Sequence, residues 1–197
     1  MPAPIYFFAG LVPWTFFSNG LTQSSNSLVS NANLISKVYF PRLAAPIAGT
    51  LAALVDFAAS FVVLGGMLVV FGVTPRPAAI VVIPALVLLA LVTALGAGLW
   101  LSALSVSYRD VHYVVPFMVQ IGLFLSLFAS NVTSEPWHTL LGLNPMATVV
   151  EGFRWALTGS TQALSAMAIL SIVASALLVV SGAIYFRQVE RGFADVI

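Results

Sequence analysis

The sequence contains few charged residues and no cysteine. Of its 197 residues, 7% are charged and 60% are hydrophobic, whereas soluble domains carry roughly 25% charged residues. A soluble fold of this composition would expose large apolar patches. Without cysteine there are no disulfides, no cysteine zinc ligands and no thiol chemistry. The composition therefore indicates that a membrane surrounds most of the chain.

Charged residues are missing from long stretches. Asp, Glu, Lys and Arg are absent from 1–36, 57–75, 77–108 and 155–186. A helix needs about 20 mostly apolar residues to cross roughly 30 Å of hydrocarbon. Lipid offers the backbone no hydrogen bonds, so such runs form helices or a closed barrel. Long, unbroken runs rich in Leu and Ala favour helices over the short alternating strands of a barrel.

The fold class predicted is all-α: a polytopic transmembrane helix bundle of about five spans, forming a single transmembrane domain over residues 1–197. The spans expected are Ile5–Val29, Ala44–Phe71, Ala78–Ala103, Tyr113–Phe128 and Leu164–Tyr185.

Two segments differ from these apolar spans. The second half of the first span carries Ser18, Asn19, Thr22, Gln23 and Ser24. We expect this half to face protein or water instead of lipid. Met146–Leu157 is apolar on one side and ends near Glu151 and Arg154. It predicts a short external helix that is interfacial or re-entrant.

Basic residues set the expected orientation. One set of flanks contains Lys37, Arg42, Arg109, Arg187 and Arg191, and the other contains Arg76 and Arg154. The positive-inside rule places the larger set in the cytoplasm. The C-terminus is then inside and the N-terminus outside. Because an external N-terminus with no earlier span is unusual, we expect a truncated or mis-started reading frame.

A short amphipathic helix is predicted between the first two spans. In Ser30–Arg42, apolar residues recur at helical spacing, and Pro41 discourages continuation. From the pattern alone, two roles remain open: contact with a cytosolic partner, or a connector anchored on lipid headgroups by Lys37 and Arg42. The same alternatives apply to Tyr108, Arg109 and Asp110 in the second cytoplasmic loop.

Asp56 is the one acidic residue placed near the middle of a predicted span. A carboxylate at this depth costs about 2.5–3.5 kcal/mol on insertion scales, so it should face the bundle or water. A proton or substrate site is one interpretation. Since no other span carries an acid, a structural packing role is favoured.

Small and aromatic residues suggest packing. Small residues that would let helices approach closely are Gly65, Gly66, Gly96, Gly98 and Ser102. Aromatic residues are dense at 6–17 and again at 117–128. They fit a belt at the membrane interface better than a lining for sugar rings, although aromatic faces also bind sugars.

Several catalytic motifs are absent from the sequence. It has no phosphate-binding loop and no HExxH motif. Its two histidines are far apart, and Glu135 and Glu151 are too isolated for an acid–base pair. A net charge of +1 gives no indication of nucleic-acid binding. We therefore expect no enzyme activity, no metal site and no cofactor in this chain.

Five short motifs follow one another along the chain: FAGLVPWTFF at 8–17, NANLISKVYFPR at 31–42, YRDV at 108–111, LNPM at 143–146 and EGFRW at 151–155. The chain ends with a sixth motif, FADVI. Together they resemble the permease subunits of ABC-2 type exporters for polysaccharides and polyol phosphates. The resemblance covers nearly the whole chain.

The resemblance implies a homodimeric permease in the bacterial cytoplasmic membrane, working with a separate ATP-binding subunit. Such an exporter moves a lipid-linked glycan or glycopolymer. The ATPase-coupling helix would comprise Leu34, Ile35, Lys37, Val38, Tyr39, Phe40 and Arg42. ATP would be bound by the partner subunit.

The sequence departs from the family at two points. The family usually has six spans and an N-terminal cytoplasmic helix, whereas this chain begins at what resembles the second span. The external segment before the LNPM motif is also shorter than usual. An ion-coupled secondary transporter or channel, and an inactive truncated membrane subunit, are the alternatives.

Overall fold

The computed structural model describes residues 3–31, 41–108, 110–128, 141, 143–159 and 165–190. Secondary structure within these ranges is helical. The long elements are α1 (Ala3–Ser30), α3 (Ala44–Val70), α4 (Ala79–Ser107), α5 (Val111–Phe128), α7 (Pro145–Thr158) and α8 (Ser165–Glu190). The predicted all-α bundle is confirmed, and each predicted span corresponds to one helix with ends that differ by a few residues.

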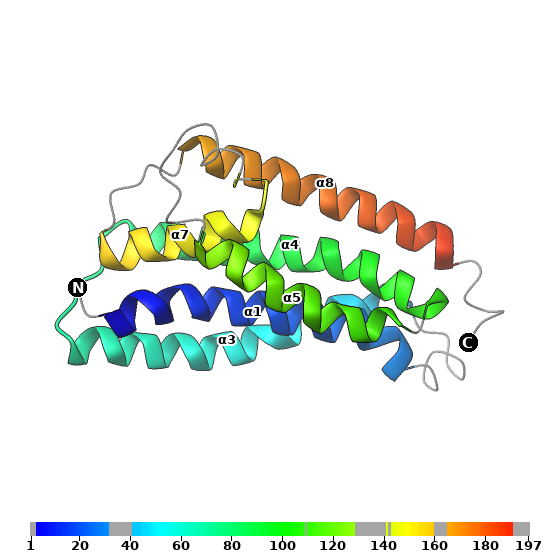
Figure 1. Ribbon diagram of the computed structural model, residues 1–197, viewed down its shortest axis with the longest axis horizontal. Coiled ribbons are helices and arrows are strands. Elements are labelled where there is room, and N and C mark those ends of the chain that lie inside the picture. The colour runs from blue at the N-terminus through cyan, green and yellow to red at the C-terminus, as the bar shows by residue number, and fades with distance from the viewer. Residues whose placement is uncertain are drawn as a thin grey trace.

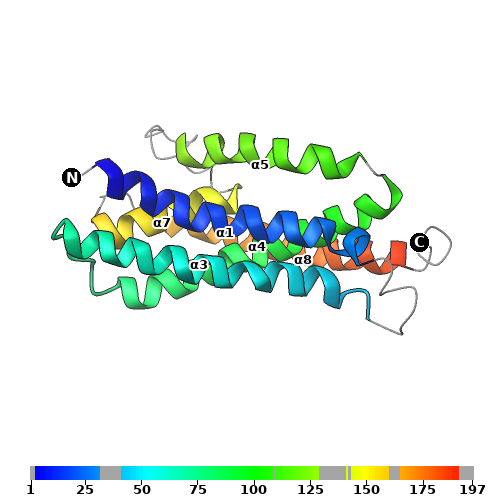
Figure 2. The same cartoon turned by 90° about the horizontal axis from the view of Figure 1, so that it is seen from below.

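The helices lie side by side along one direction, with the start of α1 and the end of α8 at opposite ends of the bundle (Figure 1). Helix α1 packs against α3, α4, α5 and α7, and α8 packs against α4 and α7. From below, α1 lies between α3 and α5 (Figure 2). Helix α1, which is polar in its second half, is therefore surrounded by other helices on several sides.

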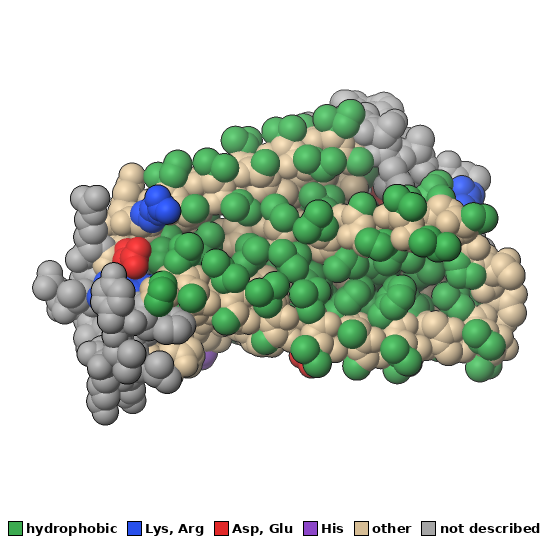
Figure 3. All heavy atoms as spheres, turned by 180° about the vertical axis from the view of Figure 1, so that it is seen from behind, with side chains coloured by type: hydrophobic (Ala, Val, Ile, Leu, Met, Phe, Trp, Pro, Cys, Tyr) green, Lys and Arg blue, Asp and Glu red, His purple; other side chains and the backbone are tan. Residues whose placement is uncertain are grey.

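Three helices are long and apolar enough to cross a membrane by length and composition: α3, α4 and α8. Helix α5 is apolar but shorter, and α1 is long but polar in its second half. On the face opposite to that of Figure 1, hydrophobic side chains cover the length of the molecule. Lys and Arg side chains gather near the two ends of that face (Figure 3). This surface suits a multi-pass membrane protein.

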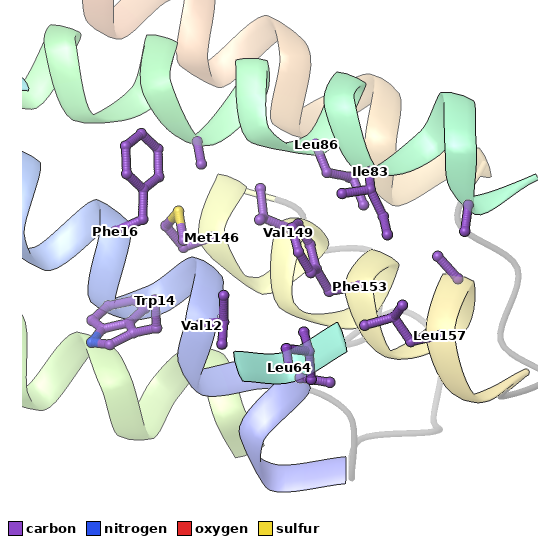
Figure 4. Packing of buried hydrophobic residues seen from close by; sticks show 14 of the residues in the cluster. Val12, Trp14, Phe16, Leu64, Ile83, Leu86, Met146, Val149, Phe153 and Leu157 are labelled. Atoms are coloured by element: carbon purple, nitrogen blue, oxygen red, sulfur yellow. The ribbon is translucent and has the colours of Figure 1, made fainter. Parts of the chain in front are cut away.

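A hydrophobic core forms where α1, α3, α4 and α7 meet (Figure 4). The ring of Phe57 on α3 lies 5.4 Å from that of Phe16 on α1 and 6.3 Å from that of Phe153 on α7. Phe16 and Trp14 are buried. The interface belt expected for them is therefore wrong, because they pack inside the bundle, whereas Phe117 and Phe124 on α5 are exposed.

Glycine brings helix backbones together at two places. A Cβ on Gly96 of α4 would lie 2.7 Å from the backbone nitrogen of Val179 on α8, and a Cβ on Gly49 of α3 would lie 2.9 Å from the backbone of Gln23 on α1. The close approach predicted at Gly96 is confirmed. A Cβ built on Gly65 or on Gly66 meets no atom within 4 Å. The close helix packing predicted at these two glycines is therefore wrong within the single chain.

Candidate functional site

Helix α7 begins at an Asn-Pro pair that also joins it to α5. Asn144 has extended backbone angles, and its side-chain oxygen accepts a hydrogen bond from the Met146 amide at 3.1 Å. Pro145 follows at the first helical turn, where its missing N–H is not needed. The Asn144 amide donates to the Ser126 hydroxyl at 3.0 Å. One residue therefore caps α7 and fixes its start against α5.

The other end of α7 is held by the loop between α3 and α4. The backbone N–H of Arg76 donates to the Ala156 carbonyl at 3.0 Å, and its Nη2 donates to the Gly159 carbonyl at 2.8 Å. Its guanidinium carbon also lies 4.8 Å from the centre of the Trp155 ring. Gly159 ends the helix with φ of 76°. A cation is favourable there because helix C-termini carry partial negative charge.

Between these ends, α7 is buried on all sides. Glu151 and Arg154 are only 6% and 2% exposed, and Val149, Val150 and Phe153 are fully buried. A helix lying on the membrane surface with one apolar side does not fit this burial. Of the two placements predicted for the segment that holds Glu151 and Arg154, the interfacial one does not fit, because other helices enclose both faces of α7. The re-entrant placement stays a prediction.

Arg154 links α7 to α1 and α5. Its Nη1 donates to the Tyr6 hydroxyl at 3.3 Å and approaches the Leu127 carbonyl at 3.5 Å. The guanidinium carbon lies 4.2 Å from the centre of the Tyr6 ring. Gly10 leaves room for it, since a Cβ there would lie 3.0 Å from Arg154 Nη2. Glu151, one turn earlier on α7, adds an attractive electrostatic interaction.

Hydroxyl pairs fix α8 against its neighbours. Thr148 of α7 and Ser171 of α8 share a hydrogen bond of 2.6 Å, and Thr93 of α4 and Ser175 of α8 share one of 2.9 Å. Sequence analysis missed these pairs. The signal was present as isolated hydroxyls inside apolar helices, which hydrogen-bond across helix interfaces in membranes.

The opposite end of the bundle gathers the residues predicted to be cytoplasmic. Arg42 donates from Nη1 to the carbonyl of Glu190 at 2.6 Å, which joins the chain entering α3 to the last turn of α8. Tyr108 is exposed beyond α4. Asp110 accepts from the amide of Tyr113 through its backbone carbonyl at 3.0 Å.

The other residues of the predicted coupling helix lie outside the described residues: Leu34, Ile35, Lys37, Val38, Tyr39 and Phe40. Arg109 of the second predicted cytoplasmic loop also lies outside them.

Asp56 lies on the exposed side of α3, halfway along the helix. Its backbone carbonyl accepts from the Ser60 hydroxyl at 2.9 Å. The neighbouring Phe57 packs inward on Phe16. The packing role favoured for Asp56 is therefore wrong within the single chain, since α3 directs Phe57 inward and leaves Asp56 exposed.

The model of the ABC-2 type transporter family matches residues 1–158 of this sequence. This chain belongs to that family. Two O-antigen export system permease proteins, both RfbA from Klebsiella pneumoniae, are each 25% identical to it over 195 residues, which is 98% of this chain and 75% of theirs. RfbA from Myxococcus xanthus is 26% identical over 155 residues, 77% of this chain and 59% of its own length.

The family assignment fixes the coarse role of the molecule. It is the membrane subunit of an ABC exporter, a transporter permease. The family also implies an ATP-binding partner subunit.

Proposed function

We propose that the permease moves a lipid-linked polysaccharide or polyol-phosphate polymer across the bacterial cytoplasmic membrane. The observation that carries this proposal is the alignment of 98% of the chain with permeases named for O-antigen export. The polymer class follows from those names and from the motifs shared with the polysaccharide and polyol-phosphate exporters. Two copies of the permease form the transport unit.

The ATP-binding subunit docks at the end of the bundle that holds Arg42, Tyr108 and Asp110. The segment Ser30–Arg42 connects α1 to α3 there, and its apolar stripe fits a groove on a partner. The hydrogen bond from Arg42 to the Glu190 carbonyl supports this role, because it couples the start of α3 to the end of α8. A push on this segment would reach two spans at once.

Helix α7 is proposed to act as the hub of the external end. It is bonded to α5 through Asn144, to α1 through Arg154, to α8 through Thr148 and to the α3–α4 loop through Arg76. The outer ends of these elements would therefore move together when the external side opens.

The test is to co-express the permease with its ATP-binding subunit. Charged substitutions Leu34→Asp, Val38→Asp and Tyr39→Asp should remove the ATPase from the purified complex and stop polymer export. Conservative changes Leu34→Met and Val38→Ile should retain both. All permeases should remain at wild-type abundance in the membrane.

Two results would contradict the proposal in different ways. An ATPase that co-purifies undiminished with all three charged variants rejects the docking segment. A wild-type pair that restores no surface glycan or polyol-phosphate polymer to an export-deficient host rejects the substrate class.

A further inference from the structure

Helix α1 separates its polar residues onto two faces. One face holds Ser24 and Ser25, both of which are 0% exposed. The other face holds Thr15, Asn19 and Gln23, four residues apart, and all three are exposed. Residues four apart lie on the same side of a helix. The exposed residues therefore form one continuous polar stripe, which we call the α1 stripe.

The α1 stripe lies at the depth of the apolar spans. Gly20, next to Asn19, faces Ala53 of α3 and Ala94 of α4, each 3.7 Å from a Cβ built on this glycine. Ala94 is near the middle of Ala79–Ser107. Asn19 is therefore level with the middle of α4, which has the length and composition of a membrane span. A polar group facing hydrocarbon without a hydrogen bond costs several kcal/mol, so lipid is a poor neighbour for the stripe.

The neighbouring helix α5 does not cover the stripe. On either side of the stripe it contacts α1, where a Cβ on Gly122 would lie 2.9 Å from the Trp14 ring and where His112 hydrogen-bonds Asn26 at 2.7 Å. Trp14 and Asn26 flank the stripe along α1. The stripe residues between these contacts remain exposed.

The buried face of α1 shows how this helix packs against protein. There, Gly20 and the small serines let α3 and α4 approach closely, and a Cβ on Gly98 would collide with the Ser24 side chain. Small residues of this kind are typical of helix contacts in membranes. The α1 stripe instead carries two primary amides, which suit water or a polar ligand better than close helix packing.

We propose that the α1 stripe lines a hydrated pathway and hydrogen-bonds hydroxyl groups of the transported polymer. The second half of this statement rests on the proposed function. Each amide offers two N–H donors and one carbonyl acceptor, which matches a sugar hydroxyl that both donates and accepts. Because the stripe carries no charge, it can hold many hydroxyl-rich chains without fixing any of them in place.

The hydrated pathway is tested by thiol labelling, for which a chain without cysteine needs no prior mutation. Asn19→Cys and Gln23→Cys are made in the permease complexed with its ATPase in membranes and treated with a charged methanethiosulfonate reagent. Val62→Cys on α3, 74% exposed on an apolar surface, is the lipid-facing control, and buried Ala94→Cys is the packed control. The thiolate is the reacting species and forms in water.

Both stripe cysteines should be modified at least about tenfold faster than both controls, because only water stabilises the thiolate. Equal rates at the stripe and Val62 would overturn the hydrated pathway and indicate lipid. Unmodified stripe cysteines that cross-link to another transmembrane segment would overturn it in favour of helix packing.

Contact with the polymer is tested separately by export. Asn19→Leu and Gln23→Leu should each slow the appearance of surface polymer by about threefold to tenfold, the change that corresponds to one lost hydrogen bond. Val62→Leu is the control and should export normally. If the wild-type permease exports polymer and both stripe variants export it equally well, the contact with the polymer is rejected, while the hydrated pathway is not. A wild type that exports no polymer instead rejects the proposed function.

Discussion

Helices α7 and α3 place their charged residues in opposite settings. On α7, Glu151 and Arg154 are almost wholly buried, and Arg154 reaches the Tyr6 hydroxyl and the Leu127 carbonyl. On α3, Asp56 is exposed halfway along the helix. The helix of ordinary spanning length thus carries its charge on the outside, and the short helix carries its charges inside.

The difference shows that burial and membrane spanning are separate properties in this molecule. Helix α3 has the length and hydropathy of a span, yet little of it is buried in the single chain. Helix α7 is too short to span and is nearly all buried, because polar groups from α1 and α5 receive its arginine. Protein groups surround the charges on α7. The stability of the charge on Asp56 instead depends on what lies outside the single chain at that surface, whether lipid, water or another protein.

The largest effect is expected from Arg154→Leu. Removing the cation takes the attraction of Arg154 away from Glu151, which is 6% exposed, and removing one member of a buried charge pair costs about 3–5 kcal/mol. The free energy of unfolding in detergent micelles should fall by that amount, measured by denaturant titration. The matched variant Asp56→Leu on α3 should not produce such a loss.

A second substitution separates charge from packing at this site. The double variant Glu151→Gln with Arg154→Leu should recover part of the lost stability, since the uncompensated carboxylate is gone. If the double variant is as unstable as Arg154→Leu alone, the loss comes from packing against Tyr6 and Gly10, and compensation of charge is not what holds α7.

Glycines offer a comparison without charge. Gly96→Leu on α4 should destabilise the permease by at least about 1–3 kcal/mol, as overpacking does, because its Cβ would lie 2.7 Å from the α8 backbone. Gly65→Leu on α3 enters open space and should leave stability within about 0.5 kcal/mol. Thermal unfolding in the same detergent measures both. A comparable loss at Gly65 would mean that α3 is covered in solution.

The spans were predictable from the sequence because they depend on composition over long runs. The span predicted at Ala44–Phe71 differs by one residue from Ala44–Val70. The burial of α7 was not predictable, because it depends on which helices surround it. Arg154 and Tyr6 are 148 residues apart in the chain, and no local pattern joins them. Polar residues on α1 were visible in the sequence, but their division into two faces required knowing where α3 and α4 lie.

Asn144→Ala tests how α7 is held at its start. The substitution removes both the cap on the Met146 amide and the bond to Ser126, and loss of an N-cap costs about 0.5–2 kcal/mol. Asn144→Asp keeps the cap but loses the amide donor, so it should fall between wild type and alanine in thermal unfolding. An aspartate variant as stable as wild type would show that the bond to α5 contributes nothing measurable.

The smallest effect is expected from Asp56→Leu in the purified permease. Because the side chain is exposed on α3, its replacement should change the free energy of unfolding in detergent by no more than about 0.5 kcal/mol. In the membrane the same change removes a mid-span carboxylate, which costs about 2.5–3.5 kcal/mol to insert, so the yield of inserted permease should rise. Quantifying membrane-integrated protein by alkaline extraction measures this yield.

Two outcomes would contradict the exposed position of Asp56. One is a variant that inserts less well, and the other is a variant whose free energy of unfolding falls by more than about 1 kcal/mol, which is more than an uncovered surface position loses. Either result would show that protein, not lipid or water, surrounds Asp56. The charged residues of α3 and α7 would then both be enclosed by protein.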